Sequence, residues 1–110
     1  MQEFSGLVRD GRVVMLGPIR QEILSGIRLP EQYQRLREKL GAFPDLALDH
    51  EDYETAALYF NTCRAKGVQG SNTDFLICAA ANRRNLTIFT PDRDFRLYRR
   101  HVGIRLHEVD

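Results

Sequence analysis

The sequence predicts an α/β fold, a sandwich of helices around a mainly parallel sheet. Three observations predict it. Short β-branched runs alternate with longer helical patterns, as in chains that cross from one strand to the next through a helix. The length of 110 residues suits one hydrophobic core, and the apolar fraction of 43% with 28% charged residues is that of an ordinary globular domain. No repeat or linker-like stretch divides the chain, so we expect a single domain over 1–110.

The first elements are short. Phe4, Leu7 and Val8 have the spacing of the last turn of an amphipathic helix, which Asp10-Gly11 would end as a turn. The run from Arg12 to Leu16 (RVVML) is apolar, β-branched and bounded by glycines, and this pattern is typical of a buried strand.

Two helices are predicted next. Pro18 favours a helix start, and the predicted helix over 19–25 ends at Gly26. A second helix follows Pro30, and Gly41 suits its C-terminal cap.

The middle of the chain predicts a short strand and two long helices. Residues 46–48 form the candidate strand, and the acidic run from Asp49 suits the N-terminus of a helix that ends near Gly67. Ser71 begins the next helix, whose body, Phe75 to Ala81, is apolar all round and therefore expected to be buried.

Predicted strands and helices alternate again in the last third of the chain. Leu86 to Thr90 (LTIFT) is predicted as a central strand that Pro91 ends. A basic helix over 94–100 and a last strand over 104–106 complete the pattern.

Composition excludes several classes of protein. The net charge of +1 is not that of a polycationic nucleic-acid-binding arm, and the longest apolar run, of about seven residues, is too short for a membrane span. Cys63 and Cys78 have no C-x-x-C spacing, and the N-terminus does not resemble a signal peptide. We therefore expect buried, reduced thiols in a cytoplasmic protein with no membrane association.

Four carboxylates are candidate site residues because ligands of α/β sheets bind beyond the carboxyl ends of strands. Glu22 lies in the helix after the first predicted strand, and Asp74 lies in the first turn of the buried helix. Asp92 and Asp94 follow the LTIFT strand. Carboxylates from separate segments are the hard oxygen ligands that Mg²⁺ or Mn²⁺ requires for phosphodiester hydrolysis.

Each candidate also has a structural interpretation. Asp74 could complete a capping box with Ser71, and Asp92 and Asp94 could be turn and N-cap residues. Glu22 borders an apolar helix face without a basic partner, which is harder to explain structurally.

The order of three segments, GPIRQEILSG around Glu22, DFLICAAA from Asp74 and LTIFTPDRDF around Asp92, resembles the PIN-domain ribonucleases, particularly VapC-type toxins. The resemblance implies a three-layer PIN-like sandwich and a ribonuclease with Glu22, Asp74 and Asp92 as ligands of Mg²⁺ or Mn²⁺. It implies Asp94 as an auxiliary acid and Thr90 as a polar neighbour. It also implies an RNA substrate, a cognate antitoxin and a homodimer.

One feature departs from that family. Its first hydrophobic strand, which ends in an aspartate followed by Ser or Thr and supplies a further ligand from the centre of the sheet, has no counterpart here. We therefore expect an N-terminally incomplete domain without the first strand. A catalytically inactive PIN fragment that serves as a protein-binding module stays open as an alternative. A phosphatase or receiver domain fits less well, because no strand ends in a D-x-D-x-T type of motif.

Four arginines flank the predicted acidic site and could hold an RNA backbone: Arg93, Arg96, Arg99 and Arg100. For any one of them taken alone, a solvated helix face is the simpler explanation.

Overall fold

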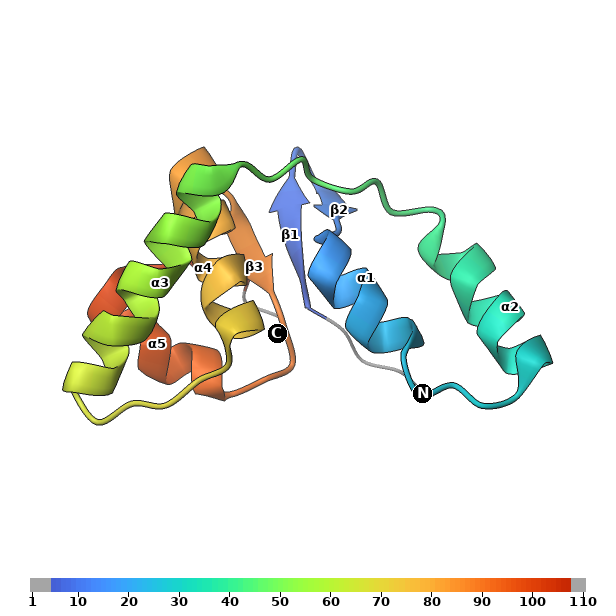
Figure 1. Ribbon diagram of the computed structural model, residues 1–110. Coiled ribbons are helices and arrows are strands. Elements are labelled where there is room, and N and C mark those ends of the chain that lie inside the picture. Colours follow the sequence, from blue (N-terminus) through green and yellow to red (C-terminus); the bar gives the residue numbers. More distant parts are fainter. Residues whose placement is uncertain (1–4, 108–110) are drawn as a thin grey trace.

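The computed structural model describes residues 5–107, and in this range the chain forms five helices and three short strands (Figure 1). The strands are β1 (Gly6–Arg9), β2 (Arg12–Val14) and β3 (Thr87–Phe89). The helices are α1 (Gly17–Leu24), α2 (Pro30–Leu40), α3 (His50–Ala65), α4 (Asn72–Arg84) and α5 (Asp94–Val102). In Figure 1, α3, α4 and α5 lie on one side of the strands and α1 and α2 on the other, as expected for an α/β fold.

The prediction of a mainly parallel sheet is not confirmed. The strand order is β2-β1-β3, and β1 pairs antiparallel with both neighbours. The connection from β1 to β2 explains why these two strands are antiparallel. Asp10 (φ 51°) and Gly11 (φ 76°) both have positive φ and form a two-residue hairpin, which joins antiparallel strands only.

The prediction that Leu7 and Val8 belong to the last turn of a helix is wrong, because both lie in β1. Leu7 is fully buried and pairs with Val14 on one side and Ile88 on the other. The third residue of the helical spacing, Phe4, lies outside the described residues. A strand in this position satisfies the backbone of both β2 and β3, so long-range pairing outweighs the weak local spacing.

The two other predicted short strands are reduced to single bridges, and these bridges are parallel. Met15 bridges Asp45, next to the predicted strand over 46–48. Leu106 bridges Ile88, and this isolated bridge is all that forms of the predicted strand over 104–106. Parallel pairing within the described residues is therefore confined to the two outer edges of the sheet.

The five other predicted helices are present, and their ends follow local signals. Pro18 and Pro30 lie in the first turns of α1 and α2. Asp49 caps α3 and forms a capping box with Asp52, while Ser71 caps α4.

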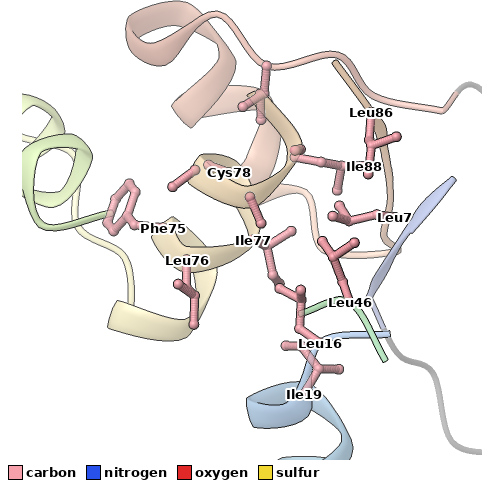
Figure 2. Packing of buried hydrophobic residues seen from close by; sticks show 14 of the residues in the cluster. Leu7, Leu16, Ile19, Leu46, Phe75, Leu76, Ile77, Cys78, Leu86 and Ile88 are labelled. Carbon is pink, nitrogen blue, oxygen red and sulfur yellow. The ribbon is translucent and has the colours of Figure 1, made fainter. Parts of the chain in front are cut away.

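Helix α4 lies at the centre of the hydrophobic core (Figure 2). Every residue from Phe75 to Ala81 is at most 5% exposed, as the apolar run predicts. Cys63 and Cys78 are buried and free, and burial raises the pKa of both thiols. The structure therefore supports a packing role for both.

A buried ion cluster joins the start of α3 to the end of α4. Asp52 is fully buried and accepts hydrogen bonds from Arg84 at 2.7 and 2.8 Å and from Arg83 at 2.7 Å. Arg83 also pairs with Asp49 and Glu51. The Arg84 hydrogen bonds are the main cause that lowers the pKa of Asp52. This acidic run therefore anchors two helices, in addition to suiting the dipole of α3.

Over residues 5–107, no helix combines the length and the apolar character needed to cross a bilayer.

Candidate functional site

A cavity of about 240 Å³ lies where α1, the start of α4 and the segment after β3 meet. Three of the predicted site residues line it, one from each segment: Glu22, Asp74 and Asp92. The fourth, Asp94, does not line it and is exposed in the first turn of α5. The structure therefore brings three of the four carboxylates to one place.

Glu22 reaches the cavity because α1 is held at a definite angle. Ile19 and Ile23 bury one face of this helix and also line the cavity. Arg20 ties the helix to the loop after α2 through the carbonyls of Leu40 (2.9 Å) and Phe43 (2.6 Å) and the carboxylate of Asp45. The Glu22 carboxylate forms no ion pair among the described residues.

Asp74 lies in the first turn of α4, and the capping interpretation describes part of its role. Its backbone N–H donates to the Ser71 hydroxyl at 3.0 Å, but its carboxylate Oδ2 accepts the Tyr98 hydroxyl at 2.8 Å. Partial burial raises the pKa of Asp74, and the nearby Asp92 carboxylate adds to this effect, while the Tyr98 hydrogen bond opposes it. Asp74 and Asp92 are therefore close enough to interact electrostatically.

Tyr98 is the residue of the candidate site that the sequence did not reveal. It is fully buried on α5, and its ring packs against Phe75 (centroids 4.8 Å apart) and Phe95 (5.1 Å). Burial and the Asp74 carboxylate raise the pKa of the Tyr98 hydroxyl, so it stays a hydrogen-bond donor. The only sequence signal for this position was the apolar i,i+3 pair Phe95 and Tyr98 in an otherwise basic helix.

Gly70 makes room for this tyrosine. A Cβ on Gly70 would lie 2.7 Å from Cζ of Tyr98 and 2.9 Å from Cε2 of Phe75, closer than real side-chain contacts allow. Both neighbours are rigid rings in a packed core, so neither can shift cheaply. The loop before α4 therefore passes directly over the Asp74–Tyr98 pair.

Asp92 combines a turn role with its place on the cavity wall. Its Oδ1 accepts the backbone N–H of Asp94 at 2.9 Å, as the turn interpretation predicts. Thr90 orients this turn, because its hydroxyl accepts the N–H of Asp92 at 3.1 Å and lies 2.7 Å from the Ser5 hydroxyl. Thr90 is thus the polar neighbour of Asp92 that the resemblance implies.

The arrangement does not form an assembled metal centre. Within residues 5–107, no three acidic, histidine or cysteine side chains are close enough together to hold a metal ion. The donor chemistry nevertheless suits a hard divalent cation, since carboxylate oxygens face the cavity from three segments and form no salt bridge with the lysines or arginines of that range.

The central strand supplies no further ligand. The family resemblance places an aspartate-bearing strand at the centre of the sheet, whereas the strand found there is β1, with the sequence Gly-Leu-Val-Arg. Its side chains include no carboxylate. The described residues therefore offer three acidic groups to the cavity.

The fold and this cavity define an α/β domain with an acidic site built from three separate segments. A protein-family model described as PIN domain matches residues 2–100, and the chain belongs to the PIN-domain family. PIN is a nuclease-type domain, and PIN domains typically use divalent metal ions. A comparison with curated proteins finds no match.

Proposed function

We propose that this protein is a metal-dependent endoribonuclease of the VapC toxin type that cleaves RNA phosphodiesters in the cytoplasm. The observation that carries the proposal is the convergence of Glu22, Asp74 and Asp92 on one cavity in a chain of the PIN-domain family. The resemblance of the three segments to VapC-type toxins supports the finer assignment.

In this proposal Glu22, Asp74 and Asp92 hold Mg²⁺ or Mn²⁺, with Asp94 as an auxiliary acid. The bound ion would neutralise charge on the phosphate and lower the pKa of water. Tyr98 donates to Asp74 and orients that carboxylate toward the cavity. Burial and the nearby Asp92 carboxylate both raise the pKa of Asp74, and a bound cation would favour the charged form of Asp74.

We also propose a cognate antitoxin and a homodimer as partners. Both partners rest on the resemblance of the three segments to VapC-type toxins. Light scattering after gel filtration should give twice the chain mass of 12.7 kDa. A monomer across micromolar concentrations would refute the dimer.

A second function, an inactive PIN domain that acts as a protein-binding module, is favoured by a specific observation. The central strand β1 has no carboxylate, and no three ligand side chains lie at coordinating distance among the described residues. Such a module would gain no stability from divalent metal.

The experiment that separates the two functions combines cleavage with metal binding. Structured RNA is incubated with the full chain in Mn²⁺, in Mg²⁺ and in EDTA, beside the Asp74→Asn variant. The melting temperature of each protein is measured with and without Mn²⁺. Asp10→Asn is the matched control, because it makes the same charge change in an exposed hairpin whose positive φ asparagine tolerates.

The nuclease proposal expects cleavage by the wild type and Asp10→Asn in metal, loss of cleavage in EDTA or with Asp74→Asn, and a rise in melting temperature with Mn²⁺. Equal RNA degradation in all samples would indicate contamination and refute the proposal. No cleavage together with no Mn²⁺ stabilisation would favour the inactive binding module.

A further inference from the structure

A second cavity, of about 60 Å³, adjoins the acidic cavity and is lined mainly by basic side chains among its charged residues. It lies beyond the end of β3, and Arg93, Arg96 and His107 line it. The two cavities share Pro91 and Asp92, so the TPDR segment separates an acidic site from a basic one. Arg99 and Arg100, the other arginines of this region, do not line it.

The basic cavity is built on ordered backbone. Ile88 and Leu106 both line it and are joined by the parallel bridge at the sheet edge. The N–H of His107 donates to the Ile88 carbonyl at 2.7 Å, which sets the histidine beside the strand, with its ring 6.1 Å from that of Phe89. Arg93 and Arg96 are three residues apart at the start of α5 and therefore share one face.

Within residues 5–107, neither of these two arginines forms an ion pair. Arg20, Arg83 and Arg84 all form ion pairs with aspartates, whereas no salt bridge among residues 5–107 involves Arg93 or Arg96. Among the described residues that line the cavity, Asp92 alone has a carboxylate, and its Oδ1 accepts the N–H of Asp94. The cavity therefore presents unpaired guanidinium groups, the side chains best suited to bind phosphate.

The volume limits what can bind there. About 60 Å³ admits a few water molecules or one phosphate group. It offers no apolar slot of the size that a stacked base requires, since its surface is formed mainly by arginine, histidine, threonine and aspartate side chains.

We propose that the Arg93–Arg96–His107 cavity is a subsite for one backbone phosphate of the RNA, the phosphate next to the one in the acidic cavity. This inference rests on the proposed function and deepens it. The subsite holds the RNA strand where it crosses the TPDR segment. It thereby places the neighbouring phosphodiester linkage over Glu22, Asp74 and Asp92.

Binding of a single-stranded RNA oligonucleotide with a 5′-hydroxyl end tests the proposal, because all of its phosphates are internal. Fluorescence anisotropy in EDTA at several salt concentrations compares the wild type with Arg93→Gln/Arg96→Gln. The control is Arg35→Gln/Arg37→Gln, which removes two exposed charges on α2. Circular dichroism and the melting temperature verify that each variant folds, and the single variant Arg96→Gln serves if the double variant does not.

The subsite predicts affinity about five- to tenfold weaker for Arg93→Gln/Arg96→Gln at low salt, and a salt slope smaller by about 0.7, the value of one single-strand phosphate contact. The control should stay within about twofold. Equal losses in both double variants, or no loss in either, would overturn the subsite. Neither result would affect the proposed nuclease, which the metal-dependent cleavage assay tests separately. Absence of RNA binding by the wild type would also overturn the subsite.

A second readout locates the phosphate. Oligonucleotides with a single neutral methylphosphonate linkage are compared, and cleavage mapping identifies the scissile position. Wild-type affinity should fall for the linkage next to that position, and the Arg93→Gln/Arg96→Gln variant should be insensitive to it. The same sensitivity in both proteins would refute the assignment of that phosphate to this cavity.

Discussion

Replacing Asp52 by asparagine should destabilise the protein more than any other single Asp→Asn change outside the cavity. The carboxylate is fully buried and receives three hydrogen bonds from Arg83 and Arg84, of 2.7 to 2.8 Å. Its second oxygen also accepts the backbone N–H of Asp49 at 2.9 Å, which closes the capping box of α3. Asparagine keeps the shape but loses the charge and one acceptor oxygen.

The magnitude follows from the partners that would remain. Breaking a buried ion pair by removing one charge costs about 3–5 kcal/mol. Here the guanidinium groups retain access to water, with side chains 26% exposed for Arg83 and 19% for Arg84. Water can therefore compensate part of the loss, and we expect about 3 kcal/mol, at the lower end of that range.

Such a loss is large for this chain. A domain of 110 residues has a free energy of unfolding of about 5–16 kcal/mol. The melting temperature of Asp52→Asn should fall by about 10–20 °C, which thermal and urea unfolding followed by circular dichroism will measure. The matched control is Asp45→Asn. Asp45 pairs with Arg20 but is 52% exposed, so its loss should cost at most about 1 kcal/mol.

The same carboxylate sets an acid limit on stability. The arginines lower the pKa of Asp52 in the folded state, so its contribution is complete above the ordinary unfolded value of about 3.9. As the pH falls below about 4, the unfolded state takes up a proton that the folded state does not. The difference in free energy of unfolding between the wild type and Asp52→Asn should therefore shrink. A difference of less than 1 kcal/mol at pH 7, or one that does not shrink in acid, would refute this account of the cluster.

Three further predictions concern the surroundings of the site. Tyr98→Phe removes the hydroxyl that stabilises charged Asp74, so the pKa of Asp74 should rise further and the pH midpoint of Mn²⁺ binding should move upward; an unchanged midpoint would show that the hydrogen bond has no effect. Gly70→Ala places a methyl group 2.7 Å from Tyr98 Cζ and should cost about 1–3 kcal/mol; a melting temperature equal to that of the wild type would contradict the contact. Both cysteine thiols are buried with raised pKa values, so the native protein should not react with a disulfide reagent within minutes, while the unfolded chain should expose two thiols; rapid native labelling would disprove their burial.

The helices could be predicted because their signals are local. Ser71 before α4 and the proline in the first turn of α1 act on residues within one turn. The apolar body Phe75–Ala81 can be satisfied in one way only, by burial on most sides, and the structure confirms it. Tertiary packing favours the same helices as the local preferences do, so the helices form where the sequence predicts them.

The strands show the limit of the same reasoning. Leu7 and Val8 are compatible with a helical turn or a strand over so short a segment, and the choice depends on pairing with β2 and with β3, some eighty residues later. Asp10-Gly11 is the typical sequence of a two-residue hairpin, but it is equally good at ending a helix. The choice of a hairpin fixes the antiparallel pairing of β1 with β2, whereas the antiparallel pairing of β1 with β3 depends on the tertiary fold.

The acidic residues of the candidate site were visible in the sequence as carboxylates that follow strands, and three of the four line one cavity. Tyr98 and the Asp52 cluster were not visible, because each depends on a contact between segments at least 24 residues apart. The chain thus encodes directly its helices, its buried α4 and its set of candidate ligands, since neighbouring residues specify these. The antiparallel sheet, the hydrogen bond that orients Asp74 and the adjoining acidic and basic cavities arise only on packing, because their free energy comes from pairs of groups that meet only in the folded molecule.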